Sequence, residues 1–294
     1  MSQATVEPDQ LASGADRRAR LRASSLYLVT DDGTPAEALP GLIAAALRGG
    51  VDVVQLRRKG VDPGELVALA VRCREVCHAA GALFVVDDHV DLALAAAADG
   101  VHLGQEDTPV AEARLRLGPE FLIGLSTHDV AEVRAAAGLD LDYIAAGPVH
   151  ETPTKAGRSA VGFEHVELAA RRTTVPVVAI GGLDATDAAT AVEAGADLVA
   201  VVRAICASPD PRAAARAIRT RIDGACAWSW IEVNGETRKC RRRESLQGLV
   251  EGLGLDPSAL VIEHNGTIVD RERWGATVLS GGDRLELVHF VGGG

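Results

Sequence analysis

The sequence predicts an α/β protein, a (β/α)8 TIM barrel followed by a small ubiquitin-like β-grasp domain. Over residues 24–222, short apolar runs alternate with Ala-rich segments that suit amphipathic helices. The runs are continuously apolar, as expected of strands buried on both faces of a parallel sheet. After residue 222 the pattern changes to short strands around tight turns with one helix. We therefore expect a flexible segment over 1–23, the barrel over 24–222, a linker over 223–227 and the β-grasp domain over 228–294.

Eight strands and eight helices in about 200 residues match a closed barrel at the small end of its size range. A doubly wound open sheet is the alternative, but eight units of similar length favour closure. The expected strands cover 26–30, 51–56, 83–87, 100–103, 121–126, 143–146, 177–180 and 198–202. The expected helices cover 36–48, 64–79, 90–97, 110–117, 129–137, 163–171, 185–194 and 211–222.

The C-terminal domain is predicted from turn and helix signals. Asn234-Gly235 separates two strand-like runs, 230–233 and 236–239, and this pair of residues is typical of a tight hairpin turn. Residues 245–255 place four apolar side chains on one helical face, and Gly254 can end that helix. Further strands are expected over 260–263 and 284–291.

Composition excludes several classes of protein. The 294 residues are 47% hydrophobic and 24% charged, which rules out wholesale disorder. The formal net charge of −11 argues against a broad surface for nucleic acid. Five cysteines at low density imply no disulfide framework, and no apolar run is long enough for a membrane span. We therefore expect a soluble cytoplasmic protein with no nucleic-acid or membrane partner.

Basic residues follow the second expected strand. Barrel active sites lie at the carboxyl ends of the strands, and Gln55 is followed there by Arg57, Arg58 and Lys59. Arginine forks beside a lysine point charge suit a polyphosphate. A solvated surface run of charge is the alternative, and the match to the barrel rule favours the ligand.

Acidic residues follow the next two strands. Strand 83–87 ends in Asp87-Asp88, and the loop after strand 100–103 carries Asp107. Carboxylates on adjacent strand ends can share Mg2+, which takes one or two carboxylates together with substrate phosphates. Helix capping is the alternative for each acid alone, but a Mg2+-diphosphate would need these acids and the neighbouring bases together.

The remaining strand ends carry hydroxyls and glycines. Ser126 ends the fifth strand, Thr152 lies beyond the sixth, and Gly181-Gly182 follows the seventh. Barrels often bind phosphate near strands 7 and 8, where glycine exposes backbone N–H groups. His102 lies within a strand, and both a core histidine and a substrate contact remain open for it. These residues together predict a Mg2+-dependent enzyme acting on a diphosphate and a second phosphorylated molecule.

Residues 24–222 resemble the thiamine-phosphate synthase family. The resemblance rests on motifs in family order, namely 54–59 (VQLRRK), 86–88 (VDD), 102–107 (HLGQED), 124–128 (GLSTH), 147–148 (GP) with 152–155 (TPTK), and 180–182 (IGG). It implies a transferase that joins hydroxymethylpyrimidine diphosphate to a thiazole phosphate and releases diphosphate. The family usually has Asn where this chain has Asp87, a contact to the pyrimidine.

The resemblance also implies roles for individual residues. Asp88 and Asp107 would bind Mg2+, and Arg57, Lys59, Ser126 and Lys155 would be catalytic. The implied substrate contacts are Gln55, Leu56, Arg57, Arg58, Lys59, Asp87, Ser126, Thr152, Pro153, Thr154, Lys155, Gly181, Gly182, Val202 and Arg203.

The C-terminal domain resembles the sulfur carrier of the thiamine pathway. The similar segments are 233–235, 265–266, 269–274, 281–283 and 289–294, which ends in Gly293-Gly294. The resemblance implies that the terminal carboxylate is adenylated by an ATP-dependent partner, becomes a thiocarboxylate and delivers sulfur to a thiazole synthase. A glycine-rich chain end without function is the alternative.

We therefore expect a bifunctional thiamine-biosynthesis protein, for which a homo-oligomer is also allowed. One rival is a thiazole tautomerase-like barrel, which needs no diphosphate–metal site. The other is a catalytically inactive barrel that serves as a scaffold for the carrier. Mg2+-dependent release of diphosphate would distinguish the three.

Overall fold

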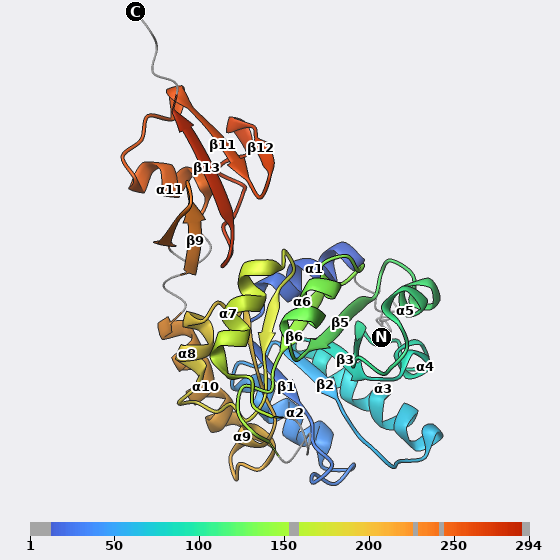
Figure 1. Cartoon of the computed structure of the whole chain (residues 1–294). Coiled ribbons are helices and arrows are strands. Elements are labelled where there is room, and N and C mark those ends of the chain that lie inside the picture. Colours follow the sequence, from blue (N-terminus) through green and yellow to red (C-terminus); the bar gives the residue numbers. More distant parts are fainter. Residues whose placement is uncertain (1–12, 153–158, 226–228, 241–243, 290–294) are drawn as a thin grey trace, which may run out of the picture.

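The structure is a computed structural model of the chain, and it describes residues 13–152, 159–225, 229–240 and 244–289. Eight parallel strands close into a barrel in the order β1 to β8, with β1 paired to β8 (Figure 1). The prediction of a closed barrel is confirmed. The strands are β1 (Leu26–Val29), β2 (Val53–Leu56), β3 (Leu83–Asp87), β4 (Gly100–Leu103), β5 (Leu122–Thr127), β6 (Tyr143–Ala146), β7 (Val177–Ala179) and β8 (Leu198–Val201).

Helices surround the barrel, and each strand is followed by at least one of them (Figure 1). Alternate side chains of a strand face opposite sides, so the barrel has two apolar layers. Tyr27, Val53, Val85 and Tyr143 fill the interior, while a larger cluster packs between strands and helices. The surrounding helices are α2 (Leu39–Arg48), α3 (Pro63–Ala79), α4 (Val90–Ala95), α5 (Val110–Leu117), α6 (Val130–Ala136), α7 (Gly162–Arg172), α8 (Ala188–Glu193), α9 (Arg203–Cys206) and α10 (Pro211–Ala225).

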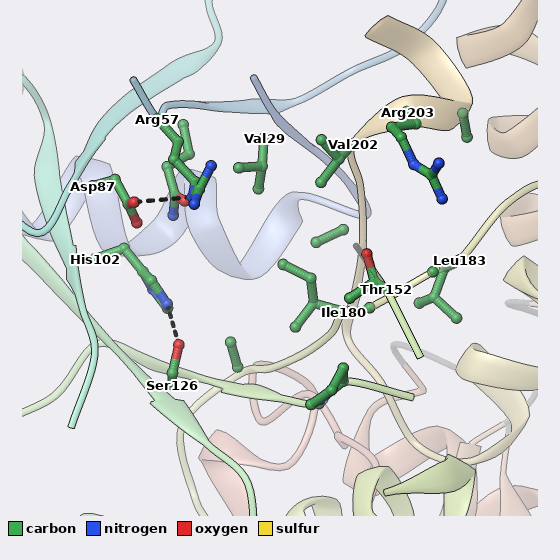
Figure 2. Close-up of a pocket in the computed structure, with 18 of the residues that line it drawn as sticks. Val29, Arg57, Asp87, His102, Ser126, Thr152, Ile180, Leu183, Val202 and Arg203 are labelled. Atoms are coloured by element: carbon green, nitrogen blue, oxygen red, sulfur yellow. Dashed lines mark hydrogen bonds and ion pairs between the residues drawn. The ribbon is translucent and has the colours of Figure 1, made fainter. Parts of the chain in front are cut away.

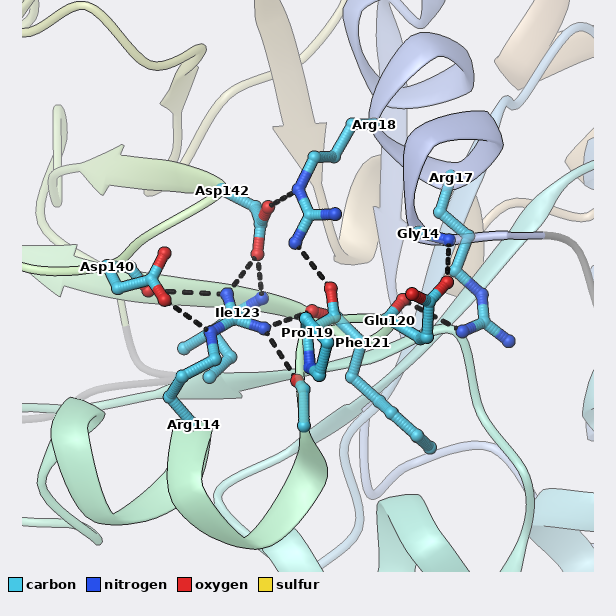
Figure 3. Close-up of polar contacts among 11 residues, drawn as sticks. Gly14, Arg17, Arg18, Arg114, Pro119, Glu120, Phe121, Ile123, Asp140 and Asp142 are labelled. Carbon is cyan, nitrogen blue, oxygen red and sulfur yellow. Dashed lines mark hydrogen bonds and ion pairs between the residues drawn. The ribbon is translucent and has the colours of Figure 1, made fainter.

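The expectation of a flexible segment over 1–23 is corrected for residues 14–23, which form helix α1 (Gly14–Ala23). Ser13 caps this helix through a capping box with Asp16. Arg17 is buried and pairs with Asp99 at 2.9 Å, and Leu21 joins the barrel interior. Arg18 pairs with Asp142 at 2.6 Å (Figure 3). Both aspartates precede strands, so α1 covers the amino-terminal end of the barrel. Residues 1–12 lie outside the described part of the chain.

The linker expected over 223–227 is also corrected in part. Helix α10 continues through Asp223, Gly224 and Ala225. The Asp223 carboxylate pairs with Arg219 at 2.8 Å, one turn earlier, and this contact supports the last turn of the helix. Residues 226 and 227 lie outside the described residues.

The C-terminal part forms a five-stranded sheet in the order β10-β9-β13-β11-β12, with β9 and β13 parallel. Both Asn-Gly pairs, 234–235 and 265–266, have positive φ angles, as a two-residue hairpin turn requires. Helix α11 (Leu246–Gly252) supplies Leu246, Leu249 and Val250 to a core of its own beneath the sheet. The strands are β9 (Ser229–Val233), β10 (Glu236–Cys240), β11 (Leu260–His264), β12 (Thr267–Val269) and β13 (Arg284–His289), with short 3-10 turns at Pro257–Ala259 and Arg271–Arg273.

The two parts meet at one end of the β-grasp sheet. Gly282, with φ +86°, lies so close to α7 that a Cβ there would overlap the Ala170 carbonyl. Strand β13 begins at Arg284, beside this contact, and extends away from the barrel (Figure 1). No helix within the described ranges is both long and apolar enough to cross a membrane.

Candidate active site

A pocket of about 330 Å³ opens at the carboxyl ends of the barrel strands, and each of the eight strands or its following turn contributes to it (Figure 2). Gln55, Arg57, Asp87, Ser126, Thr152, Gly181, Gly182, Val202 and Arg203 all line it, as do His102 and His128. Nine of the residues expected at the site are thus brought together by the closure of the barrel.

Arg57 stands between two carboxylates. Its guanidinium lies 3.5 Å from the Asp87 carboxylate through Nε and 3.4 Å from the Asp32 carboxylate through Nη1 (Figure 2 draws the Asp87 pair). Asp32 also accepts a hydrogen bond of 2.9 Å from the Lys59 backbone N–H. The end of β1 therefore fixes the end of β2, and the Arg57 side chain is held in place at the pocket wall.

The structure places Leu56, Arg58 and Lys59, the neighbours of Arg57 along the chain, differently from Arg57. Side chains alternate along β2, so Gln55 and Arg57 face the pocket while Leu56 and Arg58 face away. Leu56 packs in the outer core, and Arg58 donates to the backbone carbonyls of Asp31 and Thr34. Neither residue lines the pocket, so their expected contact with substrate stays a prediction. Lys59 is largely exposed and lies 4.0 Å from the Asp88 carboxylate.

Asp88 and Asp107 approach each other closely. Burial, followed by a hydrogen bond and like charge from Asp107, raises the pKa of Asp88, and the Lys59 ammonium partly offsets the rise. Asp107 also accepts a hydrogen bond of 2.7 Å from the Gly104 N–H. Two carboxylates this close repel each other when both are ionised, and such a pair of hard oxygen donors suits a divalent cation. Among the described residues no group of three or more His, Cys, Asp or Glu side chains gathers around one point.

The other side of the pocket is built from close backbone approaches. A Cβ at Gly181 would lie 2.4 Å from Cα of Pro148, so only glycine fits at this position, where φ is +107°. Gly181 and Gly182 leave room beside Thr152 and the turn from Val202 to Arg203. Pro153, Thr154 and Lys155, which were also expected at the site, and Gly293 and Gly294 lie outside the described residues.

The floor of the pocket is a buried polar chain. Gln55 Nε2 is 2.9 Å from the Tyr27 hydroxyl, which is 3.0 Å from that of Tyr143. The Tyr143 hydroxyl is 3.1 Å from His102 Nδ1, and His102 Nε2 is 2.9 Å from Ser126 Oγ (Figure 2 shows this last contact). His102, for which two interpretations stood open, is thus both a pocket residue and a satisfied buried group.

Sequence reasoning missed Asp32, Tyr27 and Tyr143. Asp32 follows the first strand, so the rule that located the other strand ends could have found it. The two tyrosines lie inside the strands, where an aromatic residue reads as core, and no local signal separates them from it. Taken together, the pocket offers a fixed arginine opposite a glycine-lined turn. Lys59, Asp88 and Asp107 do not line it, although they follow the same strand ends as the residues that do. The arrangement suits two phosphorylated ligands, with a cation beside the pocket.

Comparison with known proteins matches the two parts of the chain separately. A family model described as thiamine monophosphate synthase matches residues 26–205, and a model of the ThiS family matches residues 231–294. The thiamine-phosphate synthase of Nostoc sp. is 48% identical over 198 residues, which cover 67% of this chain and 56% of that protein. The chain thus spans little more than half the length of that relative.

Other relatives are matched almost completely. The thiamine-phosphate synthase of Mycobacterium tuberculosis is 45% identical over 70% of this chain and 98% of its own length. Among solved structures, thiamine phosphate pyrophosphorylase from Pyrococcus furiosus aligns with a TM-score of 0.64 at 32% identity, covering 70% of this chain and 98% of that one. A 3-hexulose-6-phosphate synthase aligns with a TM-score of 0.53 at 18% identity, covering 67% of this chain and 99% of that one, and shares the fold alone.

Proposed function

Because the chain belongs to the thiamine monophosphate synthase family over its barrel, we propose that this barrel makes thiamine phosphate. Its substrates would be hydroxymethylpyrimidine diphosphate and a thiazole phosphate. The bond between the pyrimidine methylene carbon and the diphosphate oxygen breaks, and the thiazole nitrogen supplies the electron pair for the new C–N bond. Thiamine phosphate and diphosphate are the products.

The observation that carries this proposal is the meeting of bases and acids at neighbouring strand ends. Arg57 is anchored at the pocket wall by Asp32 and Asp87, and Lys59 lies beside Asp88. Fixed cations of this kind stabilise the charge that grows on a departing diphosphate. Lys155 is proposed to add a further positive charge there, and Gln55 and Asp87 to contact the pyrimidine.

The Asp88–Asp107 pair fits Mg2+, because two neighbouring carboxylates offer hard oxygen donors whose mutual repulsion a cation would relieve. When bound, the ion supplies positive charge to the leaving diphosphate. We assign Asp88 and Asp107 as its protein ligands.

The thiazole phosphate is proposed to bind across the pocket. Gly181-Gly182 and the Val202–Arg203 turn leave backbone groups accessible there, and Thr152 adds a hydroxyl. Pro153 and Thr154 would complete that side. The two substrates then face each other over the Ser126 end of the floor.

The first test is a product assay by mass spectrometry. Purified protein is mixed with both substrates, in Mg2+ or in EDTA. We expect thiamine phosphate only with Mg2+. Product that is equally abundant in EDTA would contradict the metal assignment, and a folded protein that makes none would favour the scaffold or the tautomerase-like barrel.

Asp107→Ala provides a sharper version of this assay. We expect this variant to lose turnover while its circular dichroism stays unchanged. The matched control is Glu106→Ala, which removes an exposed carboxylate from the same loop and should retain activity. Near-normal Mg2+-dependent activity in Asp107→Ala would contradict the proposed role of the pair.

For the C-terminal domain we propose sulfur transport. The ThiS-family match and the β-grasp sheet support a terminal Gly294 carboxylate that an ATP-dependent enzyme adenylates, with release of diphosphate. A sulfur donor then displaces AMP to leave a thiocarboxylate for a thiazole synthase. Intact-protein mass spectrometry after incubation with an adenylating enzyme, ATP and sulfide should show one oxygen replaced by sulfur, and Gly294 deletion should prevent it.

We propose a cytoplasmic location for both activities. Three described cysteines, Cys73, Cys77 and Cys206, carry free thiols, which suits a reducing compartment.

A further inference from the structure

The hydrogen bonds of the buried polar chain beneath the pocket all run in one direction. The amide nitrogen Nε2 of Gln55 can only donate, so the Tyr27 hydroxyl accepts from it. The proton of Tyr27 is then directed to the Tyr143 hydroxyl, its second partner at 3.0 Å. Tyr143 in turn has His102 Nδ1 at 3.1 Å to receive its own proton. Each hydroxyl accepts one hydrogen bond and passes its proton onward.

The direction of these hydrogen bonds determines which ring nitrogen of His102 carries the proton. Because Nδ1 accepts from Tyr143, the neutral His102 ring carries its proton on Nε2, which lies 2.9 Å from Ser126 Oγ. In the other tautomer, Nδ1 would donate to Tyr143 and Tyr143 would donate to Tyr27. The Tyr27 hydroxyl would then accept from both Tyr143 and Gln55. With Nε2 donating, Ser126 Oγ accepts, and its own proton is available to the pocket.

Burial keeps the hydroxyls of Tyr27 and Tyr143 protonated. Removal from water raises the pKa of Tyr27 above its usual value, and the hydrogen bond from Gln55 offsets the rise only in part. Burial also raises the pKa of Tyr143, and the neighbouring Tyr27 raises it further. Both hydroxyls therefore keep the proton that the chain passes along.

Packing holds the rings in register. The His102 and Tyr143 rings stack with centroids 5.6 Å apart, and Tyr27 meets Tyr143 edge-on at 6.2 Å. The Tyr143 ring occupies the space over Gly124, where a Cβ would lie 2.1 Å from Cζ of the ring. Glycine in β5 thus makes room for the tyrosine from β6.

We propose that Tyr27 and Tyr143 are positioning residues that hold His102 as its Nε2–H tautomer, so that Ser126 acts as a hydrogen-bond donor toward the bound substrate. The histidine then orients the serine and does not remove its proton. The part that concerns the substrate rests on the proposed function, whereas the tautomer is a property of the free protein. An acceptor atom of the pyrimidine or of the diphosphate would receive the Ser126 proton.

Nitrogen NMR of protein labelled with 15N-histidine tests the tautomer directly. The full chain is used without substrate, and a His102→Gln variant identifies the signals of this ring. We expect a protonated Nε2 and an unprotonated Nδ1 for His102. The opposite tautomer would reverse the whole chain, make His102 a base toward Ser126 and overturn the proposal.

Two matched variants test the direction. Tyr143→Phe removes one hydroxyl and keeps the ring, and we expect the His102 tautomer to become mixed and kcat to fall about tenfold. In Tyr27→Phe, Tyr143 can still donate to Nδ1, so the Nε2–H tautomer should persist. An unchanged His102 spectrum in Tyr143→Phe would contradict the proposal. Because the NMR readout needs no turnover, a wild-type protein without synthase activity would contradict the proposed function and leave the tautomer result standing.

Discussion

At the scale of single residues, the most informative feature is the pair of carboxyls at Asp88 and Asp107. A carboxyl whose pKa is raised in the folded protein binds its proton more tightly there than in the unfolded chain. Above that raised pKa the ionised pair therefore lowers the stability of the fold. A cation that neutralises the pair should restore it.

This argument predicts the effect of metal removal. With inorganic diphosphate present, we expect Mg2+ to raise the melting temperature of the protein relative to EDTA. Asp88→Asn should raise the melting temperature in EDTA, because the repulsion is gone, and should reduce the gain from Mg2+. Scanning fluorimetry measures both effects. Equal melting temperatures in Mg2+ and EDTA for the wild type would argue against a shared cation.

The sequence predicted the pocket residues well where a strand end marked them. Arg57, Asp87 and Ser126 each follow or end an apolar run, and the barrel brings such positions together. The motif could not show that Leu56 and Arg58 point away from the pocket, because a motif read as a string ignores the alternation of side chains along β2. Tyr27 and Tyr143 were invisible because their role depends on partners from other strands.

At the scale of elements, α1 shows how a polar segment becomes part of the core. Arg17 has a side chain only 4% exposed, and it pairs with Asp99, itself 5% exposed. The guanidinium also lies 5.3 Å from the centre of the Phe121 ring. The arginines of this polar stretch made residues 1–23 look flexible. The local sequence could not show otherwise, because the partners that bury Arg17 come from residues about 80 to 100 positions later.

The contacts of α1 predict unequal costs for its two arginines. Arg17→Met leaves the buried Asp99 carboxylate with one fewer partner and should cost about 3–5 kcal/mol of unfolding free energy. Arg18→Met is the control and should cost about 1 kcal/mol or less, because Arg18 is partly exposed and Asp142 keeps Arg114 at 2.7 Å. Urea unfolding measures both. Equal losses would contradict the burial argument.

Asp99 also predicts a dependence on pH. Burial alone would raise its pKa, but the hydrogen bonds from His78 and the Phe84 N–H and the charge of Arg17 outweigh burial and lower it. The resulting stability is present above the unfolded pKa of about 3.9 and is lost as pH falls through the lower folded value. In urea titrations, the stability gap between wild type and Asp99→Asn should therefore shrink below about pH 3.9. A gap that stays constant would contradict this assignment.

At the scale of the whole molecule, the barrel and the β-grasp sheet have separate cores. Among the described residues, their apolar clusters share no buried residue. The three tryptophans, Trp228, Trp230 and Trp274, all follow the barrel, while both tyrosines lie inside it. The fold class of each part followed from periodicity in the sequence, whereas the contact between them, at Gly282, depends on a turn that no periodic pattern marks.

Separate cores predict separate unfolding. Tryptophan fluorescence should follow the C-terminal domain, and far-ultraviolet circular dichroism should mainly follow the barrel, so the two signals should give different midpoints in urea. Arg17→Met should shift the circular dichroism midpoint and leave the fluorescence midpoint in place. Coincident midpoints in both proteins would show that the domains unfold as one unit.

The position of α1 also bears on how the protein can be handled. Its first turn lies at the amino-terminal end of the barrel, opposite the pocket. A tag or surface attachment joined ahead of Ser13 would therefore hold the molecule by the face opposite the pocket. An immobilised form made in this way should leave substrate entry open.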